Sequence, residues 1–179
     1  MLYSLDTRLF LNSGVSRVCS CILPSGTIVN PEFPAAVGLR TLSVTRLQAI
    51  IFGAFVQAAP DRLPASPASG GPIMNVNAID NKTGRRVVAS IDPIMGGAGG
   101  DPFADGADGS GANSSFMKNT PVEINEAEVP IRILRYGLLP GSGGPGLHRG
   151  GLATVLEFRA EAPNTRVTAR NRDRTRFTS

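Results

Sequence analysis

Two glycine-rich stretches constrain this chain more than any other feature. The first, residues 93–111, holds seven glycines in nineteen positions, and the second covers residues 137–151. Glycine adopts positive φ readily and proline cannot continue a helix, so 21 glycines and 14 prolines in 179 residues exclude a fold dominated by long helices. We expect the first stretch to be a wrapped loop whose backbone approaches another group closely, with a flexible linker as the alternative. The second is expected to connect two strands.

One segment has the pattern of a helix. From residue 42 to residue 59 apolar side chains recur close to the 3.6-residue period, and Pro60 ends the pattern. Because its surroundings are apolar on nearly every side, we expect this helix to be buried, whereas in a slice of a larger domain its apolar surface would be exposed. Extended segments are expected at residues 15–22, 85–91, 122–139, 152–159 and 165–170.

The chain is therefore expected to belong to the α+β class, mostly β, with one buried amphipathic helix, mixed strands and two Gly-rich loops. A composition of 41% hydrophobic and 18% charged residues is typical of a globular protein. We expect residues 1–165 to form one domain and residues 166–179 an arginine-rich tail.

The charge of the chain is concentrated in that tail. Residues 166–179 hold five arginines and one aspartate, which accounts for the whole net charge of +4. A nucleic-acid site needs basic residues gathered on a folded face, so we expect no nucleic-acid partner. The longest apolar run, around residues 49–56, is too short to cross a membrane. Cys19 and Cys21 are the only cysteines, which favours a reduced, cytoplasmic protein.

Three short motifs are candidates for binding sites. Gly141–Gly146 matches the G-x-G-x-x-G fingerprint, but a strand-like segment follows where dinucleotide binding needs a helix, so we expect a strand-to-strand connection. Gly96–Phe103 matches one calcium-binding nonapeptide, a motif that works in arrays. Asp101, Asp105 and Asp108 either surround a hard cation or are solvated carboxylates in turns, and the second interpretation is favoured.

Groups suited to acid–base chemistry are few. Glu123, Glu126 and Glu128 form the densest carboxylate cluster, and on an extended segment Glu126 and Glu128 share one face, which is usually the solvated face of a strand. His148 is the sole histidine and lies in the second glycine-rich stretch with no nucleophile evident beside it. The motifs alone assign no catalytic residue.

The order of six blocks along the chain resembles the hydantoinase B/oxoprolinase family. The blocks are Asn12–Gly14, Leu23–Gly38, Ala59–Ala65, Gly96–Gly99, Asn119–Glu126 and Arg135–Gly151. The family includes B subunits of ATP-dependent N-methylhydantoinases, the corresponding region of 5-oxoprolinase, and carboxylase subunits that act on ketones. Its members are much longer than this chain, which resembles their C-terminal part only. The resemblance therefore implies that residues 1–165 are a partial domain, lacking the N-terminal half, and that residues 166–179 are a truncated tail.

The resemblance implies a division of labour. An A-type partner uses ATP to activate a lactam or imide carbonyl, and the B-type component completes the opening of the ring. The family's aspartate and histidine metal ligands lie in the front half, which this chain lacks, so we expect no metal or cofactor on this chain, a divalent metal in the absent half, and ATP on the partner. The expected partners are the A-type subunit and the missing N-terminal half.

The expected function is a fragment or split component of an ATP-dependent hydantoinase/5-oxoprolinase B subunit, which hydrolyses a cyclic amide C–N bond only together with the missing parts. One alternative is a catalytically inactive fragment that acts as an interaction domain, and another is a piece of an acetone-carboxylase-type subunit. The candidates for contact with substrate or partner, for which turn and strand structure is the alternative explanation, are Gly96, Gly97, Gly99, Asn119, Glu123 and Glu126.

Overall fold

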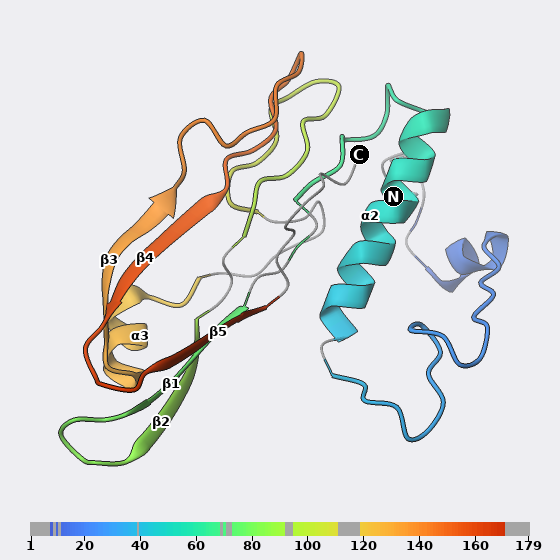
Figure 1. Ribbon diagram of the computed structural model, residues 1–179. Helices are drawn as coiled ribbons and strands as arrows, with labels where there is room; N and C mark the ends of the chain where they lie inside the picture. Colours follow the sequence, from blue (N-terminus) through green and yellow to red (C-terminus); the bar gives the residue numbers. More distant parts are fainter. Residues whose placement is uncertain are drawn as a thin grey trace.

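The structure is a computed structural model with five strands and three helical segments in its described part (Figure 1). It describes residues 8, 10, 12–38, 40–68, 70, 73–91, 95–110 and 119–170. The elements, in chain order, are the 3-10 helix η1 (Ser13–Val18), α2 (Arg40–Ala58), β1 (Ile73–Ile79), β2 (Arg86–Ile91), α3 (Val122–Glu128), β3 (Ile131–Leu138), β4 (Thr154–Ala160) and β5 (Arg166–Arg170).

The described strands form two small antiparallel sheets. One has three strands in the order β2-β1-β5, and the other pairs β3 with β4. In the first, Val76 of β1 lies opposite Ala89 of β2 on one side and Val167 of β5 on the other. The pairing of β3 with β4 shifts register between Ile133 and Arg135, which marks a β-bulge.

The hydrophobic core lies where the two sheets and α3 meet. Alternate side chains of β1 are buried, because successive residues of a strand point to opposite faces. The buried cluster is completed by residues of β2 and β3 and by the residue that follows α3, and half-buried side chains of β2, β3 and β4 pack against it. Its buried members are Met74, Val76, Ala89, Ile91, Val129 and Ile131.

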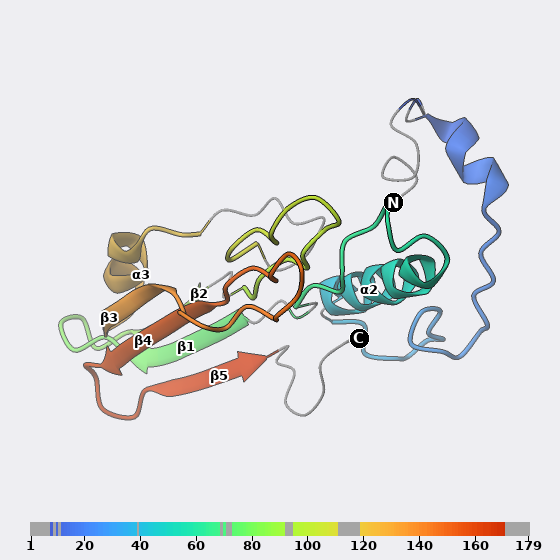
Figure 2. The same ribbon diagram turned by 90° about the horizontal axis from the view of Figure 1, so that it is seen from above.

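Helix α2 confirms the predicted helix within two residues at its start and one at its end, but the expectation that it is buried is wrong. Both views of the ribbon place α2 between the β-sheet part and residues 12–38 (Figures 1 and 2). No Cα atom of α2 lies within 8 Å of one in another described helix or strand. Among its described side chains only Ala49 is buried, so the observed helix is the exposed one expected of a slice.

The remaining predictions divide by segment. The extended segments at 85–91, 152–159 and 165–170 are confirmed by β2, β4 and β5, and the α+β class with more strand than helix is confirmed as well. Two expectations are wrong: residues 13–18 form η1 where an extended segment was expected, and residues 122–128 form α3 ahead of β3. Strand β1 was not predicted.

Helix α3 also overturns the expected carboxylate geometry, because Glu126 and Glu128 lie on a helix and do not share a strand face. Residues 171–179 of the expected tail lie outside the described residues, and the boundary at residue 165 stays a prediction. None of the helices in the described part of the chain combines the length and hydropathy needed to cross a lipid bilayer.

Candidate functional site

The two glycine-rich stretches wrap around each other. We call residues 95–110 and 139–153 together the glycine-loop assembly. The amides of Gly106 and Gly109 donate to the carbonyls of Arg149 and Leu152, and Gly151 donates to Ala98, each with an N···O distance of 2.8 Å. These bonds confirm a wrapped loop and exclude a flexible linker for residues 95–110. The connection from β3 to β4 runs through the assembly, as predicted for the G-x-G-x-x-G segment.

The three candidate glycines of the first stretch lie against the chain itself. A Cβ atom on Gly97 would overlap the backbone of Gly151, and one on Gly99 would overlap the carbonyl of Ala65. A Cβ atom on Gly96 would overlap the side chain of Ala68. The close backbone approach expected of these glycines is therefore present, and what they approach is neighbouring backbone and side chain.

An arginine and two aspartates join the two loops of the assembly. Arg149 donates from Nη1 to Asp108 Oδ1 at 2.9 Å, and its Nε lies 3.4 Å from Asp105 Oδ2. Asp108 Oδ1 also accepts from the amide of Leu152 at 2.7 Å, and Asp105 Oδ1 accepts from the amide of Arg149 at 3.0 Å. The hydrogen bond from the Arg149 guanidinium, followed by that from the Leu152 amide, lowers the pKa of Asp108, so this carboxylate stays ionised.

These bonds explain why the three aspartates of the first stretch do not form a cation site. Asp101 Oδ1 accepts from the amides of Phe103 and Ala104 at 2.7 and 2.6 Å, while Asp105 and Asp108 face Arg149. Within the described residues no three histidine, cysteine, aspartate or glutamate side chains gather as metal ligands. The described residues therefore do not fit a divalent-metal site.

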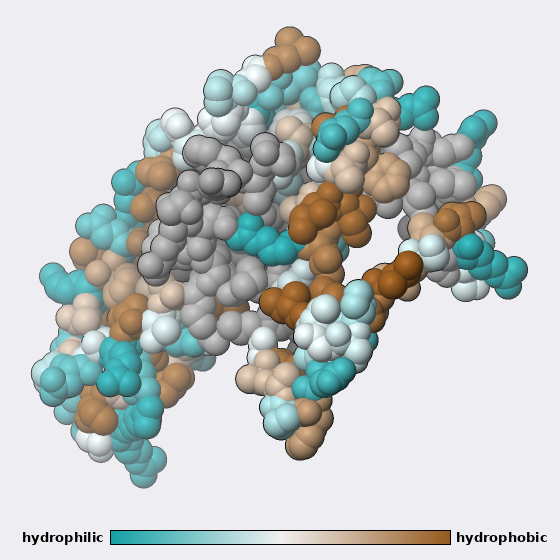
Figure 3. Space-filling model, turned by 45° about the vertical axis from the view of Figure 1, so that its right-hand side comes forward, coloured by the Kyte–Doolittle hydropathy of each residue, from teal (hydrophilic) through white to brown (hydrophobic). Residues whose placement is uncertain are grey.

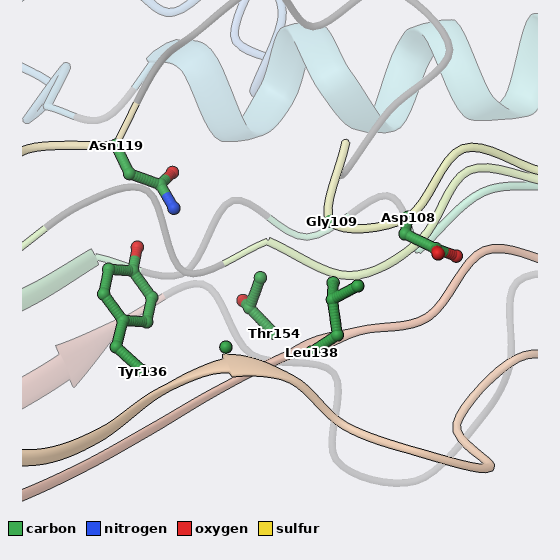
Figure 4. Close-up of a pocket in the computed structure, with 7 residues that line it drawn as sticks. Asp108, Gly109, Asn119, Tyr136, Leu138 and Thr154 are labelled. Carbon is green, nitrogen blue, oxygen red and sulfur yellow. The ribbon is translucent and has the colours of Figure 1, made fainter.

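A cavity of about 300 Å³ lies beside the assembly, next to the end of β3 and the start of β4 (Figure 4). Asn119 and Tyr136 direct their amide and hydroxyl groups toward each other across it (Figure 4). The Thr154 hydroxyl donates to the carbonyl of Met95 at 2.7 Å, which ties the start of β4 to the loop. The lining residues are Asp108, Gly109, Asn119, Tyr136, Gly137, Leu138 and Thr154.

The cavity brings together one predicted candidate and several residues that the sequence analysis missed. Asn119 was a candidate, whereas Asp108 was considered only as a cation ligand and Tyr136 and Thr154 were not singled out. A signal for Tyr136 was present, because it lies inside one of the blocks that carry the family resemblance. The cavity offers the amide of Asn119, the phenol of Tyr136 and the hydroxyl of Thr154, whereas the Asp108 carboxylate points away from it toward the assembly (Figure 4). Such polar groups suit a small polar ligand.

The two candidate glutamates lie on α3, away from the cavity lining. Glu126 is largely buried and joins α3 to β3: its Oε1 accepts from the amide of Ile133 at 2.7 Å, and its Oε2 pairs with Arg132 Nη1 at 2.9 Å. Glu123 is exposed in the first turn of α3. The structure therefore separates the six candidates into three places: Asn119 at the cavity, the glycines inside the assembly, and the glutamates on α3.

The sole histidine lies at the edge of the assembly. His148 Nδ1 is 3.7 Å from Asp105 Oδ1, and its side chain is about one-third exposed, at 30%. It does not line the cavity. The geometry gives His148 a place beside the Arg149–Asp105 contact and assigns it no catalytic role.

Comparison with known families gives a match over nearly the whole chain. The family model described as Hydantoinase B/oxoprolinase matches residues 1–178. The chain belongs to the hydantoinase B/oxoprolinase family. The cavity and the glycine-loop assembly are therefore features of a hydantoinase B/oxoprolinase domain.

Several curated proteins are similar to this family member. An uncharacterised protein of Methanocaldococcus jannaschii is 43% identical over 83% of this chain and 25% of its own length. The beta subunit of the caprolactamase of Pseudomonas jessenii is 35% identical over 82% of the chain and 26% of its own length. The B subunit of a putative D-/L-hydantoinase of a Pseudomonas strain is 29% identical over 82% and 24%. The chain spans about a quarter of the length of these relatives.

A solved structure shows the same fold. A chain in a nucleotide-free structure of acetone carboxylase superposes with a TM-score of 0.73, covering 93% of this chain and 23% of that one at 19% identity. The hydantoinase B/oxoprolinase fold is thus present in a longer polypeptide, and at this identity the likeness concerns the fold alone.

Proposed function

We propose that this chain is part of an ATP-dependent B component of the hydantoinase or 5-oxoprolinase type, which hydrolyses a cyclic amide C–N bond only together with the remainder of such a component and an A-type partner. The observation that carries the proposal is the 35% identity with the beta subunit of caprolactamase, of which the chain covers 26%. A caprolactamase is named for a lactam, a cyclic amide, which agrees with the substrate class that the family name indicates.

The chemistry explains why such a reaction is divided between polypeptides. An unstrained amide is a poor electrophile, and phosphorylation of its carbonyl oxygen by ATP creates a leaving group before water attacks. In this proposal ATP binds the A-type partner, and the divalent metal belongs to the part of the B component that this chain does not contain. The exposed free cysteines Cys19 and Cys21 support a reducing compartment, the cytoplasm, for the complex.

The contribution of this chain is assigned to the cavity. The Asn119 side chain is able to donate a hydrogen bond from its amide nitrogen to a carbonyl oxygen and to accept one from a ring N–H at its amide oxygen, while the Tyr136 and Thr154 side chains line the same cavity. These groups bind and orient a small polar substrate. No nucleophile or general base is assigned to them, and the hydrolytic step belongs to the remainder of the B component.

The test is a complementation assay. The beta subunit of caprolactamase, with the quarter that matches this chain replaced by the chain itself, is mixed with an A-type partner, ATP and caprolactam, hydantoin or 5-oxoproline. ATP-dependent release of the ring-opened product is expected with at least one substrate. A folded chimera that assembles with the A-type partner and yet turns over none of the three would refute the proposal.

The role of the cavity is tested in the same assay. Asn119→Ala is expected to lower kcat/KM about tenfold, mainly through KM, since one hydrogen bond to bound substrate is lost. Glu123→Ala, on the exposed side of α3, is the matched control and should leave both constants unchanged. Equal effects of the two substitutions would contradict the assignment of the cavity.

A second candidate function is a catalytically inactive interaction domain. It is favoured by the exposed apolar side chains of α2, which are typical of a surface that another polypeptide covers. Binding to the remainder of a B component without any ATP-dependent turnover would support this candidate over the first. The acetone-carboxylase alternative has only the shared fold in its support.

A further inference from the structure

The outward face of α2 is apolar. Val44, Leu47, Ile50 and Ile51 are 50%, 41%, 67% and 43% exposed. At 100° per residue these four positions, with the exposed Ala54, fall on one stripe along the helix. We call this set the α2 stripe, and it carries no charged residue.

The inward face of the same helix mixes polar and apolar residues. Its half-buried members include Thr45, Arg46, Gln48, Phe52 and Val56, and Ala49 is buried at 8% exposure. A surface helix normally keeps its apolar stripe toward the core and polar residues toward water, whereas α2 is apolar on its outward face as well. The sequence of α2 therefore suits a helix that is covered on its outer side as well.

Residues 12–38 add to the same exposed region. This segment lies on the far side of α2 from the sheets (Figures 1 and 2). Its large apolar side chains are exposed, and Figure 3 shows hydrophobic residues gathered on the side of the molecule where α2 lies. The exposed large apolar residues of the segment are Val18, Ile22, Leu23, Ile28, Phe33 and Val37.

We propose that the α2 stripe is the docking surface for the remainder of a B component, the part of the family's length that this chain does not contain. The inference rests on the proposed function. Two observations point to this occupant, and an A-type partner or a second copy is distinguished from it by the experiment below. The relatives carry about three quarters of their length outside the matched region, and the stripe lacks charge.

The chemistry of the stripe supports a permanent contact. Interfaces between polypeptides that assemble and separate have polar rims and an overall polarity near that of the protein surface. A stripe formed by valine, leucine, isoleucine and alanine resembles a domain core cut in half, which is typical of contacts within one chain or one obligate complex.

The experiment measures whether the stripe becomes covered. Cys19 and Cys21 are replaced by serine and Ile50→Cys is introduced, both in the isolated chain and in the chimera with the beta subunit of caprolactamase. Labelling by a maleimide is expected to be fast in the isolated chain and at least about a hundredfold slower in the folded chimera, because a buried thiol reacts only through local opening. The unfolded chimera, labelled in denaturant, gives the limiting rate.

Three outcomes would overturn the proposal. Equal labelling rates in chain and chimera would show that the remainder leaves the stripe open. Slowing of the isolated chain at higher concentration would assign the stripe to a second copy. Slowing of the chimera only after an A-type partner is added would assign it to that partner.

A second measurement covers the case in which the chimera does not fold. The chain is co-expressed with the beta subunit of caprolactamase lacking the matching quarter, and the two are expected to purify together. Ile50→Glu should abolish co-purification, whereas Leu134→Glu, at a 54% exposed position of β3, should preserve it. Loss of binding in both variants, or in neither, would contradict a specific role of the stripe.

These readouts are independent of turnover. A chimera in which Ile50→Cys is protected but which opens no cyclic amide would uphold the docking surface and refute the proposed function. An active chimera in which the same thiol labels freely would refute the docking surface and uphold the proposed function.

Discussion

Gly97 shows at the level of one residue why the first glycine-rich stretch has its composition. Gly97→Ala is expected to reduce the free energy of unfolding by about 3 kcal/mol, because the new methyl group would overlap the backbone of Gly151 and force the two loops apart. Urea denaturation followed by circular dichroism measures the change. Gly144→Ala is the matched control, since a methyl group there meets open space in the same assembly. A similar loss in both variants would contradict a role for close packing.

Asp108 gives the assembly a dependence on pH. Its pKa is lowered in the folded chain, first by the Arg149 hydrogen bond, so its contribution to stability is complete above its unfolded pKa of about 4 and is lost as pH falls through the lower folded value. Asp108→Asn should therefore be less stable than the parent chain at pH 7, and the gap should narrow below about pH 4. Thermal unfolding between pH 3 and pH 7 measures it.

The control for this prediction is Asp80→Asn. The pKa of Asp80, in the turn between β1 and β2, is lowered first by the Thr83 hydroxyl and then by the Lys82 amide. The turn lies outside the glycine-loop assembly, so the two variants should differ at Leu152. Asp108→Asn should shift the amide NMR signal of Leu152, and Asp80→Asn should leave that signal unchanged. A stability gap for Asp108→Asn that is constant with pH would contradict the assigned ion pair.

For single residues, the sequence predicted the kind of contact but not the contacting residues. Gly96, Gly97 and Gly99 were expected to approach another group closely, and they do. The sequence does not reveal that the neighbouring residues are Ala68, Gly151 and Ala65. Asn119 became a candidate through the family resemblance. Tyr136 lies on β3 and Thr154 on β4. The two residues reach the same cavity only because these strands pair, and the sequence does not show that pairing.

Helix α3 contains an unusual buried group. Asn125 is 1% exposed, and its Oδ1 has no hydrogen-bond partner, on a helix that packs against β2 and β3. Asn125→Leu is expected to raise the free energy of unfolding by about 1 kcal/mol, because an unpaired buried polar atom is replaced by an apolar side chain of similar size. Chemical denaturation measures the gain.

Asn77→Leu serves as the control for that substitution. The Asn77 Oδ1 accepts a hydrogen bond from Arg86 Nε at 3.1 Å, so its removal should bring no gain. If Asn125→Leu instead destabilises the chain, the amide has a role that the packing of α3 does not explain.

Helices and strands were predicted correctly from the sequence where the local sequence pattern is long and clear. Helix α2 has a long 3.6-residue period and a proline stop, and both ends were predicted within two residues. Helix α3 is only seven residues long, and its alternating Val122-Glu-Ile suits a strand as well. We infer that the contact of Glu126 with β3 favours the helical conformation over the strand. In strand β1, Met74-Asn-Val-Asn-Ala78 alternates apolar residues with asparagine, a strand signal in the sequence that the prediction missed, and the three apolar residues are buried.

At the scale of the whole molecule, the described residues form two regions with different amounts of burial. The sheets and the end of α3 share a core, while α2 and residues 12–38 expose most of their apolar side chains. Hydrogen exchange on the dilute isolated chain should therefore be at least about tenfold faster at the α2 amides than at those of β1, because local opening of α2 breaks few contacts. Mass spectrometry of the two peptides measures this, and equal protection would mean that α2 is held by contacts beyond those described.

The position of β5 has a consequence for how the chain is made. β1 is the central strand of its sheet, and one of its two neighbours is β5. Val76 of β1 therefore pairs with Val167 of β5 only after all of the intervening chain has been synthesised. Until then one edge of β1 is open, and such unpaired edges invite pairing with other chains. During synthesis the sheet thus stays incomplete until residue 170 has been added, and any ribosome-stalled product that ends before β5 should be a preferred client of chaperones.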